Sequence, residues 1–171
     1  MKSTIEKLFI DEFGFNINDM AFDTPYNVEE ANIAILAFDE ENNSDAYAKV
    51  ISAIKKPCKN SVVIKLENKE DWEEPVDAKH LYAIYKSNNK VDYCYAEDLV
   101  KGNSVLTSSG LTKIVDTKKD NTINFTLDIQ TSTGNYYTNN ILSHNSPMAK
   151  LPSQCVVPST MVDIVDENEL V

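Results

Sequence analysis

A series of short apolar stretches, separated by turn residues, constrains the fold of this chain more than any other feature of its sequence. In the clearest stretch, Val62, Ile64 and Leu66 alternate with the residues between them, which is the two-residue period of a half-buried strand. Similar stretches lie at Ile33–Ile35, Val50–Ile54, Leu81–Tyr85, Ser104–Thr107, Ile123–Ile129 and Tyr136–Leu142, with Gly102, Gly110 and Gly134 at turn positions. We therefore predict a mostly β domain, in which the first two stretches form a long hairpin around the acidic turn Asp39–Asn43.

The first residues have a different pattern, which is typical of one short helix. Ser3 and Glu6 have the spacing of a capping box. Ile5, Leu8, Phe9 and Phe13 then fall on one face of a helix that Gly14 can terminate. The polar segment that follows, residues 16–30, contains Pro25 and is expected to be a loop.

Length and charge exclude several classes of protein. At 171 residues the chain is long enough for one domain with a sizeable core. Its net charge of −11, from 16 basic and 27 acidic residues, argues against nucleic-acid binding. No apolar run approaches membrane-spanning length, and the first residues lack the apolar core of a signal peptide. Neither nucleic acid nor a membrane is therefore an expected partner.

The cysteines and histidines argue against a disulfide framework and against a zinc site. The three cysteines (Cys58, Cys94 and Cys155) are odd in number and lack paired spacing, which predicts a reducing compartment such as the cytoplasm. Cysteines of this kind are most often inert, small apolar residues. Two histidines without a Cys-x-x-Cys pair do not form a structural zinc site. We expect no metal and no cofactor.

The sequence His144-Asn145-Ser146 places three groups that can cut and rejoin a backbone next to one another. The Asn145 side-chain amide can attack its own carbonyl and release the following residue. His144 can donate a proton during that step, as a general acid does. Ser146 carries a hydroxyl that can accept an acyl group. These three residues are therefore candidates for self-processing chemistry.

Several segments resemble the splicing motifs of inteins, and they occur in the order of that family. Gly134–Ser146 (GNYYTNNILSHNS) resembles the C-terminal splicing motif, and Leu127-Asp128-Ile129 resembles its opening strand. Val76–His80 (VDAKH) resembles the Thr-x-x-His motif, and Tyr95–Leu106 is similar to the stretch that follows it. Together with the strands that precede His80, the resemblance covers most of residues 1–145.

The resemblance implies a fold and two segments. The fold is the mostly β, horseshoe-shaped Hint fold, with one short N-terminal helix and without its first strands. Residues 1–145 are then the intein domain, and residues 146–171 are the start of the host protein, the C-extein. Three prolines and an acidic end predict that this tail is extended and has no core of its own.

The resemblance also implies a role for each candidate residue. His80 polarises or protonates the scissile amide at the N-terminal junction, with Asp77 in support. Asp128 positions or activates groups at both junctions. Ser146 takes the acyl chain as an ester, and Asn145 cyclises with help from His144. Each domain acts once, so the activity is self-processing and not turnover catalysis.

The family's N-terminal nucleophile, usually a cysteine, has no counterpart before the predicted helix. Cys58 is a poor substitute, because it follows the strand segments that the family places inside the domain. We therefore expect a split intein whose partner is a short N-terminal fragment carrying the cysteine, which completes the sheet by strand addition. The interval from Leu99 to Phe125 is too short for a homing endonuclease, so the chain resembles a mini-intein. The resemblance and the reducing compartment together imply the cytoplasm of a prokaryotic or phage-infected cell.

Four residues depart from the family pattern. Asp77 stands where threonine is usual, Gly134 where many members have a second histidine, and Asn140 where glycine is usual. Asn139 and Asn140 are both expected in a turn, because asparagine tolerates left-handed backbone. Pro147 restricts Ser146 to extended backbone. These departures bear on the rate and efficiency of splicing.

Other interpretations stay open. A lone His80 beside a strand is more often a hydrogen-bonded structural residue, and Asp128 is ordinarily a solvated carboxylate at a strand end. For the whole chain, one alternative is a degenerate Hint domain that only cleaves after Asn145. Another is a small, non-catalytic, β-rich interaction module in which His-Asn-Ser is a coincidence.

Overall fold

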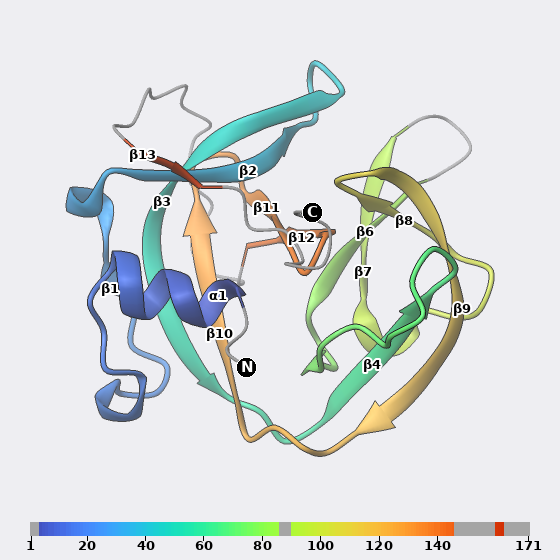
Figure 1. Cartoon of the computed structure of the whole chain (residues 1–171), viewed down its shortest axis with the longest axis horizontal. Helices are drawn as coiled ribbons and strands as arrows, with labels where there is room; N and C mark the ends of the chain where they lie inside the picture. Colours follow the sequence, from blue (N-terminus) through green and yellow to red (C-terminus); the bar gives the residue numbers. More distant parts are fainter. Residues whose placement is uncertain (1–3, 86–89, 146–159, 163–171) are drawn as a thin grey trace.

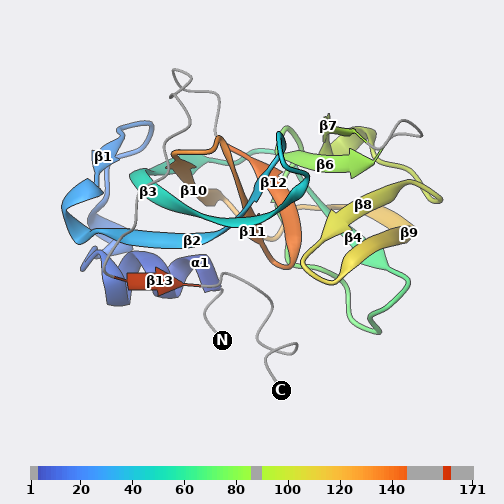
Figure 2. The ribbon, with the colours of Figure 1, turned by 90° about the horizontal axis from the view of Figure 1, so that it is seen from above.

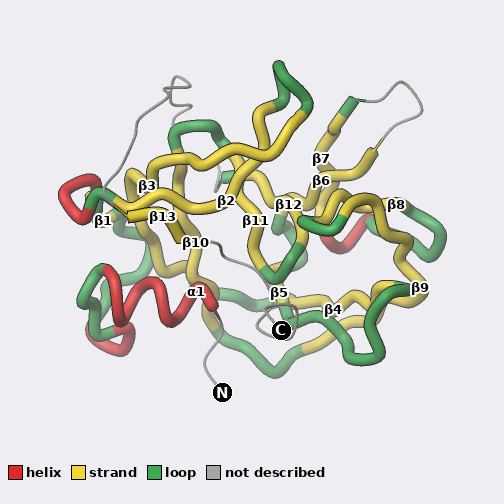
Figure 3. The backbone as a smooth tube through the Cα atoms, turned by 45° about the horizontal axis from the view of Figure 1, so that its top comes forward, coloured by secondary structure: helices red, strands yellow, loops and turns green. Residues whose placement is uncertain are grey.

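The computed structural model describes residues 4–85, 90–145 and 160–162. Figure 1 shows a horseshoe of two strand-rich lobes, which are joined at their base by the connections from β3 (Ser44–Pro57) to β4 (Ser61–Leu66) and from β9 (Gly110–Asp120) to β10 (Phe125–Thr131). Strands dominate the described chain (Figure 3). The predicted mostly β class is therefore confirmed.

The predicted N-terminal helix is present and packs on the first lobe. It consists of α1 (Thr4–Lys7) and one π-helical turn (Leu8–Glu12), and it ends where Gly14 adopts a φ of 73°. Leu8 and Phe9 are buried in the core of that lobe. Of the predicted capping box, Ser3 lies outside the described residues. The segment expected to be a loop contains two 3₁₀ turns (Ile17–Asp19 and Glu29–Ala31) and the short strand β1 (Tyr26–Asn27).

The first sheet contains the predicted hairpin. β2 (Ile33–Asp39) and β3 pair antiparallel around an acidic turn, in which Asn43 has a φ of 51°. The long β3 continues past β2 and pairs with β1 and β10. β13 (Thr160–Val162) pairs in parallel with the start of β2. This short strand belongs to the tail that was expected to be extended.

The second sheet contains strands that the sequence pattern did not indicate. β7 and the long β9 were not predicted, because charged residues interrupt their apolar alternation. Among the predicted strands, β4, β6 and β8 lie where they were expected. A 3₁₀ turn (Ala96–Asp98) connects β7 to β8. The strands of this sheet not yet given are β5 (Val76–Asp77), β6 (Leu81–Tyr85), β7 (Val91–Tyr95), β8 (Ser104–Thr107), β11 (Asn135–Thr138) and β12 (Ile141–His144).

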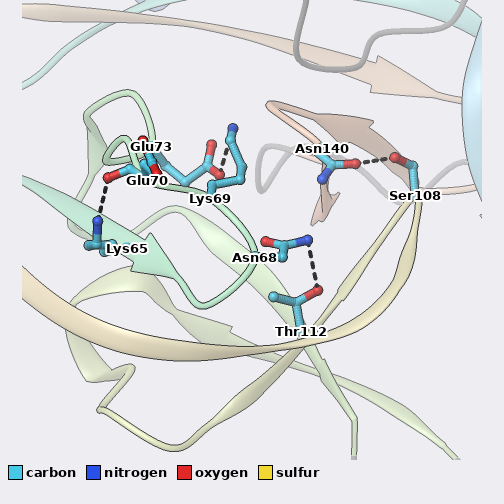
Figure 4. A network of polar contacts seen from close by, with 8 residues as sticks. All are labelled: Lys65, Asn68, Lys69, Glu70, Glu73, Ser108, Thr112 and Asn140. Atoms are coloured by element: carbon cyan, nitrogen blue, oxygen red, sulfur yellow. Dashed lines mark hydrogen bonds and ion pairs between the residues drawn. The ribbon is translucent and has the colours of Figure 1, made fainter. Parts of the chain in front are cut away.

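The segment Tyr136–Leu142 is not one strand, as the apolar pattern predicted, but a hairpin of β11 and β12. Asn139 and Asn140 form its two-residue turn with φ values of 49° and 71°, which confirms their prediction as turn formers. The Asn140 side chain accepts a hydrogen bond from the Ser108 hydroxyl (Figure 4), and its carbonyl accepts one from the Ser108 amide at 3.1 Å. The turn is thus fixed to the β8–β9 hairpin.

The loop before β5 is held by polar contacts, most of them drawn in Figure 4. Lys69 Nζ lies 3.0 Å from a Glu73 carboxylate oxygen, and the Lys65 ammonium donates to the Glu70 carbonyl. The Glu73 amide donates to the Ile64 carbonyl at 2.8 Å. These contacts fasten the loop to β4, so that the turn after β5 has a fixed position.

Two contacts join the lobes near β11. The Asn135 side chain donates to the Phe38 carbonyl at 3.0 Å and accepts from the Phe38 amide at 2.9 Å. The carboxamide thus satisfies both backbone groups of Phe38, as a neighbouring strand would. Phe38 also packs with Leu106, Tyr137 and Leu142 in a small core between the sheets. Figure 2 shows β11 and β12 between the two lobes. In the described part of the chain no helix is long and apolar enough to cross a membrane.

Candidate functional site

A cavity of about 570 Å³ contains most of the predicted site residues. Its wall is made of the start of α1, the turn after β5, the first half of β10 and the ends of β11 and β12. Of the predicted site residues, Asp77, His80, Asp128, His144 and Asn145 line it. Ser146 lies outside the described residues. The fold therefore brings together groups that are up to 68 positions apart (145 minus 77) in the sequence.

His80 is placed by a tight turn that Asp77 caps. The Asp77 carboxylate accepts from the Lys79 amide at 2.8 Å, and the Asp77 carbonyl accepts from the His80 amide at 2.9 Å. The Ala96 amide donates to the His80 carbonyl at 2.7 Å. Asp77, which stands where the resembled family has threonine, thus holds the turn with its side chain.

The His80 ring has a direct partner on β12. Its Nε2 lies 2.9 Å from the Ser143 hydroxyl, and the Tyr82 ring packs edge-on at 4.7 Å between centroids. Burial lowers the pKa of His80, and the negative charges of Asp128 and Asp77 oppose that effect. The neutral imidazole is therefore favoured near pH 7, with acidic groups close enough to stabilise its protonated form.

Asp128 lies in the middle of β10, opposite Ile54 on β3, and not at a solvated strand end. It is partly buried and lines the cavity. Burial raises the pKa of Asp128, whereas the positive charges of His80 and Lys56 lower it. Asp128 and His80 therefore act on each other electrostatically across the cavity.

His144 ends β12 and contacts the backbone of the next residue. Its Nδ1 lies 2.9 Å from the Asn145 carbonyl oxygen. The Tyr93 ring packs edge-on against the imidazole at 4.8 Å between centroids, and the Tyr93 hydroxyl accepts from Asn135 Nδ2 at 3.3 Å. With its proton on Nδ1, His144 donates to the carbonyl that precedes Ser146 and polarises it.

Asn145 is buried and held on all sides. Its amide donates to the Gly134 carbonyl at 2.8 Å. Its side-chain oxygen accepts from the Thr131 amide at 3.1 Å and lies 3.3 Å from the Thr131 hydroxyl. Its side-chain nitrogen donates to the Thr131 carbonyl at 3.2 Å. The carboxamide is thus held in one orientation by Thr131.

Sequence reasoning missed Thr131, Ser143 and Tyr93. A weak signal existed for Ser143. Because it immediately precedes His144, the Ser143 side chain is expected on the opposite face of a strand that ends at His144. Nothing in the sequence indicated that Thr131 or Tyr93 reaches the C-terminal junction, because both contacts depend on pairing between distant strands.

Neither cysteine in the described part of the chain lines the cavity. Cys58 is buried, and its thiol donates to the Asn60 carbonyl at 3.4 Å. Burial, with the nearby charge of Asp77, raises the pKa of Cys58 to about 11. Its thiol is therefore a poor nucleophile near neutral pH. Among residues 4–85, 90–145 and 160–162, no group of three His, Cys, Asp or Glu side chains is placed to hold a metal ion.

No protein-family model matches the sequence, and no curated protein is similar to it. Solved structures, in contrast, resemble it closely in fold. A transcription factor IIB Mvu mini-intein is 20% identical with a TM-score of 0.63, over 80% of this chain and 86% of its own. An intein from a hyperthermophile is 14% identical with a TM-score of 0.63, over 82% and 87%. A DnaB intein from Synechocystis sp. PCC 6803 is 17% identical with a TM-score of 0.54, over 66% and 78%. The chain therefore has the Hint fold of the inteins.

Proposed function

We propose that this chain is a protein-splicing domain that excises itself by acyl transfer to Ser146 and cyclisation of Asn145. The observation that carries the proposal is the contact of 2.9 Å between His144 Nδ1 and the Asn145 carbonyl oxygen, beside a buried Asn145 carboxamide. A histidine that polarises this carbonyl favours attack on it and cleavage of the bond to Ser146. The intein-like fold is consistent with this chemistry.

In the first step, a thiol attacks the carbonyl that precedes it, and an amide becomes a thioester. The departing amide nitrogen needs a proton, and His80 is proposed to polarise that amide and supply the proton. Asp128 supports this role, because its negative charge stabilises the protonated form of His80. The acyl chain then passes from sulfur to the Ser146 hydroxyl, which leaves the thiol free and forms a branched ester.

In the last step, Asn145 Nδ2 forms a bond to the Asn145 carbonyl carbon, and the bond from that carbon to the Ser146 nitrogen breaks. Nδ2 loses one proton, and the Ser146 nitrogen gains one. The freed amine then attacks the ester, so that a peptide bond joins the exteins. His144 is proposed to stabilise the negative charge that develops on the carbonyl oxygen.

The thiol is proposed to come from a separate, short N-terminal fragment, so that splicing occurs in trans. Cys58 and Cys94, the cysteines of the described chain, do not line the cavity. Within the described residues, Phe125–Asp128 of β10 pair with β3 on one side, and they line the cavity. An added strand from the fragment can pair with the other edge of β10 and bring its thiol close to His80 and Asp128. Thiol chemistry requires a reducing compartment, such as the cytoplasm of a prokaryotic or phage-infected cell.

The test is intact mass spectrometry of the chain mixed with a synthetic peptide that carries a tag followed by a cysteine-led intein start. We expect a product in which the tag is joined to residues 146–171, and its absence with the Asn145→Ala variant. A His80→Ala control should still release the tail but form little joined product. An unchanged mass of both components in every mixture contradicts the proposal.

A second function is favoured by the unequal completeness of the two junctions. The groups proposed to cut after Asn145 lie together in the described residues, whereas neither cysteine described there lines the cavity. A domain that only cleaves after Asn145 would release residues 146–171 without joining them to the tag. The same mass spectra distinguish this outcome from splicing.

A further inference from the structure

Resting on the proposed function, the geometry points to Thr131 as a residue that activates the Asn145 nucleophile. We propose that the Thr131 amide and hydroxyl form a donor pair for Asn145 Oδ1, and that this pair stabilises the charge that the carboxamide develops as Nδ2 attacks. The inference adds Thr131 to the residues of the reaction and assigns it a task that differs from that of His144.

Thr131 lies where the pairing of its strand with β3 is irregular. Gln130 pairs with Ser52 and Thr131 with Val50, so β3 contains the extra residue and the ladder is disrupted next to Thr131. Both main-chain groups of Thr131 then serve the Asn145 carboxamide: its N–H lies 3.1 Å from Oδ1, and its carbonyl lies 3.2 Å from Nδ2. Thr131 is fully buried, so water does not compete for these contacts.

The Thr131 hydroxyl has one hydrogen and three oxygens within 3.5 Å, of which the Thr133 hydroxyl is the most distant. The Thr131 hydroxyl lies 2.7 Å from the Asn135 carbonyl oxygen and 3.3 Å from Asn145 Oδ1. In the resting protein the shorter contact is the stronger one. When negative charge builds on Oδ1, a small rotation of the hydroxyl redirects its hydrogen to that oxygen. Its contribution therefore grows toward the transition state, which is the condition for acceleration.

The chemistry of a primary amide explains why such a donor pair matters. The Nδ2 lone pair is delocalised into the carbonyl, so a neutral carboxamide is a weak nucleophile. Loss of an Nδ2 proton gives an imidate whose negative charge lies largely on Oδ1. Fixed donors at that oxygen lower the cost of forming the imidate, as an oxyanion hole does for a tetrahedral intermediate. The Thr131 carbonyl, which accepts a hydrogen bond from Nδ2, holds the Asn145 carboxamide in this orientation.

Gly134 supports this assignment. Where many members of the resembled family have a second histidine, Gly134 offers its carbonyl to the Asn145 amide at 2.8 Å and has no side chain that could reach the carboxamide. Thr131 is the residue whose amide, carbonyl and hydroxyl all reach the Asn145 carboxamide in the described structure.

The first test compares rates of release of residues 146–171 from the full chain by intact mass, for wild type, Thr131→Val, Thr131→Ser and Thr133→Val. Valine keeps the shape of threonine and removes the hydroxyl, so release should slow about tenfold. This loss is smaller than the loss of a typical oxyanion-hole donor, because the hydroxyl lies 3.3 Å from Asn145 Oδ1. Thr131→Ser should stay within about threefold of wild type, because the hydroxyl is retained. Thr133→Val is the matched control, since the Thr133 hydroxyl contacts Asn135 at 3.2 Å and the Thr131 hydroxyl only at 3.5 Å, and it does not contact Asn145. This variant should react like wild type.

Equal rates for Thr131→Val and wild type, or a serine variant as slow as the valine variant, overturn the inference. A second measurement covers the case in which the wild-type chain does not release its tail, which would count against the proposed function alone. By nitrogen-15 NMR, the base-catalysed exchange of the Asn145 Nδ2 protons passes through the same imidate. This exchange should be about tenfold slower in Thr131→Val than in wild type, and an unchanged exchange rate overturns the inference independently of cleavage.

Discussion

The two halves of the candidate site differ in how they are built. Around Asn145, hydrogen bonds of 3.1 and 3.2 Å to the Thr131 backbone fix the side-chain carboxamide, and His144 Nδ1 lies 2.9 Å from the Asn145 carbonyl oxygen. His80 and Asp128 line the cavity of about 570 Å³ together with His144 and Asn145, and Asp128 acts on His80 through charge. In the proposed reaction, the Asn145 half acts on its own residue, whereas the His80 half acts on a segment that enters the cavity.

This difference implies different sensitivities. A half-site that holds its substrate in place gains from each oriented hydrogen bond, because the reacting groups are already positioned. A half-site that receives a segment depends on electrostatics and on the entering strand. Variants of the two halves should therefore affect separate steps.

The largest effect is expected for His144→Ala. The substitution removes the imidazole that lies 2.9 Å from the Asn145 carbonyl oxygen, so release of residues 146–171 should slow between about 10²- and 10⁴-fold. The thioester step should be unchanged, as measured by dithiothreitol-induced release of the tag from a cysteine-led peptide. An equal loss in both steps would show that the halves are not separate.

His80→Ala should give the reverse pattern, with an effect of about 10² on tag release and little on tail release. The pH dependence has a defined sign: because burial lowers the pKa of His80, the protonated acid is scarce near pH 7. At a fixed thiolate concentration, the thioester step of the wild type should therefore accelerate as the pH falls toward that pKa. Tag release measured between pH 5 and 8 checks this, and a rate that rises with pH contradicts the acid role.

Asp128→Asn should slow tag release about tenfold by removing the charge that stabilises protonated His80. The pKa of His80 should fall further. Only two histidines are present, so the ring signals of His80 can be assigned and followed directly in an NMR titration.

Asp128→Asn should also change the stability of the fold, and the change should depend on pH. The pKa of Asp128 is raised by burial, so its stabilising contribution is present below the unfolded pKa near 3.9 and is lost as the pH rises through the folded pKa. The asparagine variant should therefore have a higher Tm than wild type at pH 7 and no such advantage at pH 3. A lower Tm at pH 7 would mean that Asp128 makes favourable contacts that outweigh its desolvation.

The smallest effect is expected for Ser143→Ala, which tests the link between the halves. The Ser143 hydroxyl contacts His80 at 2.9 Å, and the next residue is His144. Loss of one neutral hydrogen bond is worth about 1 kcal/mol, or about fivefold, and it should appear in tag release. Ser143→Thr, which keeps the hydroxyl, is the matched control. A loss confined to tail release would place Ser143 in the other half.

The sequence predicted well those features that depend on neighbouring residues. The hairpin of β2 and β3 follows from two apolar stretches around an acidic turn, and the helix that buries Leu8 and Phe9 follows from their spacing. The turn at Asn139 and Asn140 was also expected, yet the apolar pattern extended a strand through it. β9 was missed because its exposed, charged residues conceal the alternation.

The candidate site was predictable only in part, for a physical reason. His80, Asp128, His144 and Asn145 stand in recognisable motifs, and the structure brings them to one cavity. Thr131 contacts Asn145 and Tyr93 packs against His144 through strand pairing that local sequence does not encode. The contacts around Asn145 and His144 could therefore be identified only from the three-dimensional structure.

The most direct test of this account is the chemical identity of the new end at Asn145. The chain is incubated at neutral pH, and the fragment ending at Asn145 is analysed by high-resolution mass spectrometry, with Asn145→Ala as control. Cyclisation predicts an aminosuccinimide end, lighter than an asparagine carboxylate by the mass of a water molecule, and no cleavage in the control. An asparagine carboxylate that appears from the earliest time points, or equal cleavage in Asn145→Ala, would contradict cyclisation at the C-terminal junction.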